Sequence, residues 1–169
     1  MPIPEDKARK LAELEAQVAK EPSNPNLHRK WITERVNAEC IPGGGENPRR
    51  IAMISWAVVE LKRRLSMQGH TPGTRSGFLH WIALYLSSLG RWEDAANAYD
   101  EFWSHSVSEK MEDMDWYDLK FAADAYERAG RSEDAKRALS DWMAWAISSG
   151  EGEEWEISDI AQKLAAFSR

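Results

Sequence analysis

Apolar residues recur every three or four positions along most of this chain, and no run alternates between apolar and polar residues with a period of two. This pattern predicts helices and no strands. The expected helices span residues 4–20, 26–40, 48–65, 75–89, 92–104, 116–129, 132–148 and 156–167. In the segment 75–89 apolar residues extend almost all the way around the helix, so we expect it to lie at the centre of the fold.

Proline and glycine separate these helices. The strongest interruption is Ile41–Pro48, which contains three consecutive glycines and ends with Asn47 as an expected helix cap. A phosphate-binding loop is excluded here, because no Gly-Lys-Ser/Thr ending and no preceding strand are present. We interpret the segment as a loop between helices. The acidic stretches 109–118 and 151–156 are likewise interpreted as solvated connectors.

A short motif occurs twice. Gly90-Arg-Trp-Glu-Asp-Ala95 aligns with Gly130-Arg-Ser-Glu-Asp-Ala135, and in both copies a leucine precedes the glycine by 11 residues. The glycine can adopt the left-handed conformation that ends a helix. Alanines at matched positions (Ala83, Ala123, Ala95 and Ala135) are small enough to let two helices approach closely. Each copy therefore predicts an antiparallel helical hairpin.

The paired hairpins resemble the tetratricopeptide repeat (TPR), over residues 76–149. The copies depart from that family in three ways: the glycines are 40 residues apart rather than 34, no proline follows either second helix, and Leu139 replaces an aromatic residue. Residues 1–75 do not match, although the helices at 26–40 and 48–65 could form a third, degenerate hairpin. Residues 150–169 resemble a capping helix. The chain 1–169 is thus expected to be one all-α domain, a right-handed α-α superhelix of seven or eight helices.

The resemblance also implies a binding surface, because TPR proteins bind peptides or partner proteins along a concave face lined by the first helix of each hairpin. Carried over by alignment, the groove positions are His80, Leu84, Ser87, Tyr117, Lys120, Asp124 and Glu127. This mixed set lacks the lysine and asparagine residues by which some members of the family hold a C-terminal carboxylate. We therefore do not expect that ligand.

Nine tryptophans are a large number for 169 residues, and most are expected to pack between helices. Three of them, Trp56, Trp103 and Trp145, lie off the apolar stripe of their helix. Tryptophan is enriched at the energetic centres of protein interfaces. These three are therefore candidates for an interaction surface.

Charge is divided unevenly along the chain, although the total is only −6. Residues 1–85 contain 13 basic and 9 acidic residues, whereas residues 86–169 contain 9 basic and 19 acidic ones. The acidic half repels a nucleic-acid backbone, so nucleic acid is an unfavourable partner. The one basic cluster, Lys62, Arg63 and Arg64, is a candidate docking patch for an acidic partner or, as the alternative, for nucleic acid.

Residues that could carry chemistry are scattered. The four histidines have no spacing that would direct two rings to one metal, and the single cysteine, Cys40, is interpreted as a small buried apolar residue. No Ser-His-acid arrangement is recognisable. We expect no catalytic activity, no metal and no cofactor.

No secretory signal is recognisable, and the longest uncharged stretch, 76–90, has 15 residues where a membrane span needs about 20. A cytoplasmic location is the default expectation. The function predicted from the sequence is that of a protein-protein interaction module, an adaptor, chaperone or inhibitor subunit that binds another protein or a peptide. Self-association is a further possibility, and the alternative is a nucleic-acid-associated regulator that uses the basic end of the helix at 48–65.

Overall fold

The computed structural model describes residues 3–39, 48–109 and 116–167. Within these ranges the chain forms eight helices and no strand, which confirms the predicted fold class. The helices are α1 (Glu5–Lys20), α2 (Pro25–Glu39), α3 (Pro48–Leu65), α4 (Pro72–Ser88), α5 (Trp92–Ser108), α6 (Asp118–Arg128), α7 (Ser132–Ser149) and α8 (Glu154–Ala166). The predicted roles of Cys40, Asn47 and most of the 41–48 loop concern residues outside the described ranges.

Two helix boundaries differ from the sequence prediction by three or more residues. Helix α4 begins at Pro72 rather than at residue 75, because the hydroxyl of Thr71 accepts a hydrogen bond from the backbone N–H of Thr74 and Pro72 occupies the first turn. Helix α5 continues to Ser108 rather than ending at 104. No glycine or proline lies between those two positions, so nothing in the local sequence ends the helix earlier.

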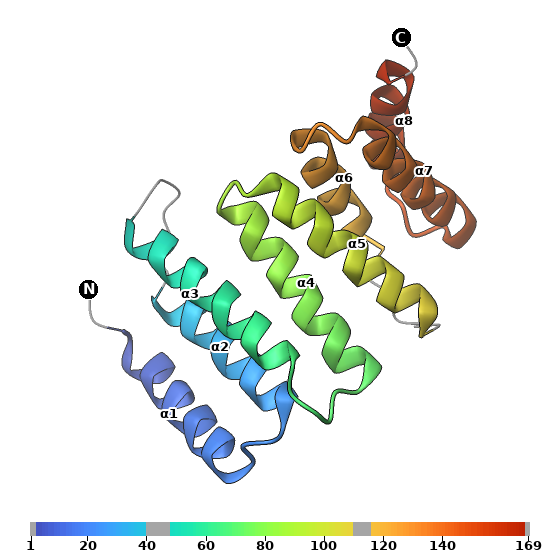
Figure 1. Ribbon diagram of the computed structural model, residues 1–169. Coiled ribbons are helices and arrows are strands. Elements are labelled where there is room, and N and C mark those ends of the chain that lie inside the picture. The colour runs from blue at the N-terminus through green and yellow to red at the C-terminus, as the bar shows by residue number, and fades with distance from the viewer. Residues whose placement is uncertain (1–2, 40–47, 110–115, 168–169) are drawn as a thin grey trace.

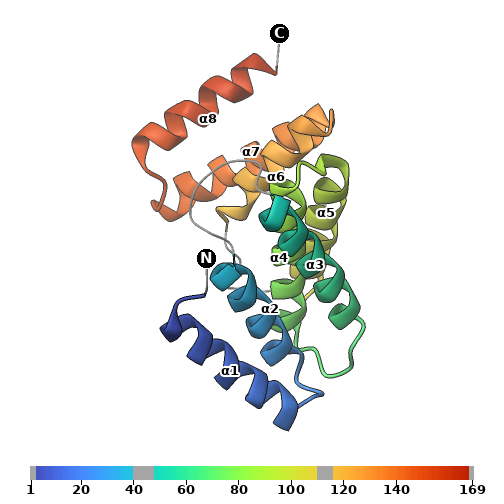
Figure 2. The same cartoon turned by 90° about the vertical axis from the view of Figure 1, so that its left-hand side faces the viewer.

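Consecutive helices lie side by side in chain order, so the two termini are at opposite ends of the array (Figure 1). The helices pair as three hairpins, α2 with α3, α4 with α5, and α6 with α7. Helix α1 packs on α2, and α8 packs on α7. The hairpin that the sequence left open, formed by the segments around 26–40 and 48–65, is therefore present. In the view of Figure 2, α1 and α8 lie at the left of the molecule, and α3 and α5 lie at the right.

The core runs the length of the stack. Its largest fully buried side chains include Ile32, Leu61, Phe78, Tyr99 and Trp142. The four alanines at matched positions in the hairpins are all buried, with Ala83, Ala95 and Ala135 at 0% and Ala123 at 3% exposure. Their burial agrees with the role predicted for them between paired helices, and α4 is the central, extensively buried helix that its composition indicated.

The repeated motif has the same conformation in both copies. Gly90 and Gly130 have φ angles of 68° and 76°. The next residue donates its N–H to a carbonyl five positions back, Arg91 to Leu86 and Arg131 to Tyr126. The arginine side chain then holds the aspartate three residues further on, at 2.8 Å in each copy. The Gly-Arg-x-Glu-Asp pattern is therefore explained by the geometry of a helix end followed by a helix start.

We expect Gly130→Ala to lower the free energy of unfolding by about 1 kcal/mol, because an L-residue is strained at this positive φ. Gly73→Ala is the matched control: Gly73 lies in the first turn of α4 with a negative φ, and an added methyl group there meets nothing within 4 Å. That control is expected to leave stability unchanged or raise it by up to about 1 kcal/mol. Urea unfolding followed by circular dichroism measures both. Equal effects for the two variants would contradict the assignment of Gly130 as a conformational requirement.

Candidate functional site

The positions predicted for a concave groove lie on one face, on α4 and on or next to α6, but many are engaged within the chain. His80 Nδ1 lies 2.8 Å from the buried carboxylate of Asp118, so it joins the first helices of two hairpins. The Ser87 hydroxyl donates to the carbonyl of Ala83. Leu84 is half-buried. The α4 part of this face is therefore largely committed to the internal packing of the stack.

Helix α8 faces the α6 part of the same surface. Lys120, Asp124 and Glu127 line a cavity of about 100 Å³ together with side chains of α7 and α8. The Lys120 ammonium forms an ion pair with Glu156 of α8, and it also lies over the rings of Tyr117 and Trp142. These contacts leave little room for a partner segment where α8 is in place.

A much larger groove opens between α5 and α7, the second helices of two successive hairpins. Its volume is about 720 Å³. The lining residues are Asp100, Trp103, Ser104, Val107, Trp116, Leu119, Tyr126, Asp134, Arg137, Ala138, Asp141, Ala144, Trp145 and Ser148. We call this the α5–α7 groove. It is of the size that ligand and peptide sites occupy, and apolar side chains predominate toward one end.

The apolar end is built from three tryptophan rings that contact one another in a row. The ring centroids of Trp103 (α5) and Trp116 are 6.2 Å apart. Those of Trp116 and Trp145 (α7) are 6.0 Å apart, and these two rings stack with only 10° between their planes. Val107, 67% exposed, lies one turn beyond Trp103. Two tryptophans that the sequence singled out, Trp103 and Trp145, thus meet in one site. The third does not: Trp56 packs edge-on against Trp31, with Arg35 over its ring.

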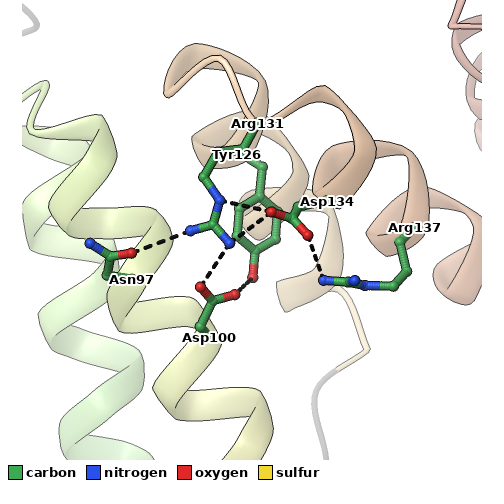
Figure 3. Close-up of polar contacts among 6 residues, drawn as sticks. All are labelled: Asn97, Asp100, Tyr126, Arg131, Asp134 and Arg137. Carbon is green, nitrogen blue, oxygen red and sulfur yellow. Dashed lines mark hydrogen bonds and ion pairs between the residues drawn. The ribbon is translucent and has the colours of Figure 1, made fainter.

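The polar end is fixed by a network centred on Arg131 (Figure 3). Its guanidinium donates a hydrogen bond to Asp134, in the first turn of α7, and another to Asp100 of α5, each at 2.8 Å. The Tyr126 hydroxyl donates to the same Asp100 at 2.6 Å, and Arg137 donates to Asp134 at 2.7 Å. These bonds tie the two walls of the α5–α7 groove together.

The network also sets the ionisation of its members. The hydrogen bond from Arg131 holds the pKa of Asp134 below its ordinary value. Burial raises the pKa of the Tyr126 hydroxyl, and the hydrogen bond to Asp100 raises it further. Tyr126 is therefore a neutral donor and Asp134 a charged acceptor at neutral pH. The groove's polar end consequently keeps a fixed charge pattern.

The basic cluster of the sequence is partly neutralised. Arg63 bonds the carboxylate of Glu60 at 3.0 Å, and the Nε of Arg64 lies 3.6 Å from an oxygen of the same carboxylate. Lys62 is exposed at this end of α3. The cluster therefore presents less positive charge than its three residues suggest.

The remaining histidines contact backbone carbonyls. His28 lies 2.9 Å from the carbonyl of Pro22, His70 lies 3.1 Å from that of Arg64, and His105 lies 3.0 Å from that of Pro72. Each of these contacts connects the histidine to a turn or to the start of a helix.

Across the ranges that the structure describes, no three His, Cys, Asp or Glu side chains gather as metal ligands would. The described helices also include none with the length and apolar character that crossing a bilayer requires.

Sequence reasoning missed much of the α5–α7 groove, in particular Asp100, Val107, Asp141 and Ala144. The TPR resemblance directed attention to the first helices of the hairpins, whereas this groove lies between second helices. Val107 and Ile147 occupy the same position of the 40-residue repeat and are both exposed, at 67% and 62%, but only Val107 lines the groove. Single exposed apolar residues are ordinary on a protein surface, so this repeat alone does not mark the groove.

Comparison with known proteins adds a fold likeness only. No protein-family model and no curated protein matches the chain. A crystal structure of BtubC (BKLC) from P. vanneervenii is similar, with a TM-score of 0.66 over 96% of this chain and 14% sequence identity. This chain spans 63% of the length of that one. The likeness supports the all-helical stacked architecture.

Proposed function

We propose that this chain is a protein-interaction module that binds a partner protein in the α5–α7 groove, without catalysis. The observation that carries the proposal is the cluster of Trp103, Trp116 and Trp145 at one end of a cavity of about 720 Å³. Large, partly exposed aromatic rings in a concave site are the usual anchors of protein interfaces. A module of this kind serves as an adaptor, a chaperone or an inhibitor subunit.

The architecture supports the same proposal. The α4–α5 and α6–α7 hairpins have matched glycine bends and buried alanines, as the TPR resemblance implies, and α2 and α3 stack beside them. We propose that the stack is TPR-like. The partner, however, is proposed to use the face formed by second helices rather than the one facing α8. The single cysteine is compatible with a reducing compartment, and we propose the cytoplasm.

The alternative, a nucleic-acid-associated regulator, would use the basic end of α3. The pairing of Arg63 and Arg64 with Glu60 weakens it, as does the acidic character of residues 86–169. Protein binding is therefore the better supported of the two functions.

A photo-crosslinking amino acid tests the proposal when placed in the full chain within the source cell. Ser104 and Ser148 line the α5–α7 groove, and exposed Ser66 follows the basic end of α3 as the matched control. We expect protein adducts from positions 104 and 148 but not from 66. Nucleic-acid adducts from 66 alone would favour the alternative. No adduct from either groove position would refute the proposed function.

A further inference from the structure

The length and lining of the α5–α7 groove match a helix. Along α7 the groove extends from Asp134 to Ser148, about 21 Å at roughly 1.5 Å per residue. That is the length of about four helical turns. Small side chains line both walls, Ser104 on α5 and Ala138, Ala144 and Ser148 on α7, and they allow another helix to approach closely.

The two ends of the groove differ in chemistry, which restricts the occupant further. One end presents tryptophans and Val107, and the other presents the carboxylates of Asp100, Asp134 and Asp141 against one lining cation, Arg137. Asp134 is saturated by Arg131 and Arg137. Asp100 keeps 40% of its side chain exposed despite its bond to Arg131. The groove therefore offers negative charge close to an apolar surface.

Asp141 is the carboxylate of the groove that most clearly lacks a partner within the described residues. It is exposed on α7, one turn from Trp145, and it forms no ion pair or hydrogen bond with any residue in the described parts of the chain. A cation on the occupant would pair with Asp141 and would also be attracted by the partly exposed carboxylate of Asp100, although Tyr126 and Arg131 already bond its two oxygens. The acidic excess of residues 86–169 would attract such a partner and repel nucleic acid and anionic membranes.

We propose, resting on the proposed function, that the occupant of the α5–α7 groove is a cationic amphipathic helix of a partner protein. Its large apolar side chain contacts Trp103, Trp116 and Trp145. A lysine or arginine one to two turns away on the same face contacts Asp141 and Asp100. Recognition thus combines helix-in-groove packing with a charge contact that fixes the register.

A display library of helical peptides, with one face randomised, tests this when selected against the full chain. We expect enriched peptides to carry an apolar stripe with Lys or Arg, and to bind at least 10-fold more weakly to Ala144→Trp or Ser148→Trp, which fill the groove. Ala52→Trp, on the exposed face of α3, is the control and should bind as the parent does. Asp141→Asn should weaken binding several-fold and reduce its dependence on salt.

Three results would overturn the inference: no enrichment, enriched helices that are acidic or uncharged on the binding stripe, or equal binding to the parent and to Ala144→Trp. The crosslinking experiment separates this failure from failure of the proposed function. If positions 104 and 148 still capture a protein, the groove binds a partner of another chemistry. If they capture none, both proposals fail.

Discussion

Trp142→Ala is expected to lower the free energy of unfolding by about 4 kcal/mol, because Trp142 is the bulkiest of the fully buried side chains in the described residues. Trp142 is fully buried on α7, where its ring lies 6.2 Å from both Tyr117 and Trp145 and under the ammonium of Lys120. Truncation leaves a cavity that rigid helices cannot fill, and it removes support from the aromatic wall of the groove.

Trp155→Ala is the matched control, since that tryptophan on α8 is 69% exposed. It should change stability by less than about 0.5 kcal/mol. Urea unfolding monitored by far-ultraviolet circular dichroism compares the variants without depending on tryptophan emission. A loss below about 1 kcal/mol for Trp142→Ala would contradict the burial described here.

The second large effect is expected for His80→Leu, which should cost about 3 kcal/mol. The substitution removes the imidazole 2.8 Å from Asp118 and leaves a carboxylate that is only 1% exposed without this partner. A buried charge that loses its partner retains the cost of leaving water. The pair joins α4 to the start of α6, so the loss loosens the contact between successive hairpins.

The double variant His80→Leu, Asp118→Leu should recover most of that loss, because it removes the stranded charge. Recovery is not expected to be complete, since Asp118 also places negative charge in the first turn of α6. Lys163→Leu on α8 breaks an exposed ion pair with Asp159 and should cost less than about 1 kcal/mol. Asp118→Leu alone completes the cycle, and a double variant whose loss equals the sum of the two single losses would show that the pair is not coupled.

The hairpins could be predicted from sequence because their determinants are local. A glycine at positive φ, an arginine that bonds an aspartate three residues later, and alanines at fixed offsets all act within about 20 residues. Helix α4 began earlier than expected because the hydroxyl of Thr71 outweighs the adjacent proline and glycine as a boundary signal.

The groove was harder to predict because it is made by residues 30 to 40 positions apart. Arg131 bonds Asp100 across 31 residues, and no pattern within either helix indicates that pairing. Trp103 and Trp145 were found because their position off the apolar stripe is visible in a single helix. Asp141 and Ala144 have no such mark, since an exposed aspartate and an exposed alanine are ordinary on a helix surface.

The concave positions show the opposite difficulty. Lys120, Asp124 and Glu127 line a small cavity with side chains of α7 and α8, and the family alignment carries no information on what α8 covers. The ion pair between Lys120 and Glu156 depends on how the chain returns after α7. In the connection between α7 and α8, Gly152 lies so close to Ala146 that a Cβ added to the glycine would be 2.6 Å from the Cβ of Ala146.

Within the described residues each helix packs mainly on its chain neighbours, with α2 on α4 in addition, and no contact of comparable extent links the first hairpin to the last. The molecule therefore behaves as a one-dimensional array in which cohesion passes from unit to unit. Its ends, α1 with no buried residue and α8 with two, are the least firmly held. Amide hydrogens should accordingly exchange fastest at both extremities and slowest in α4, and unfolding should proceed inward from the edges.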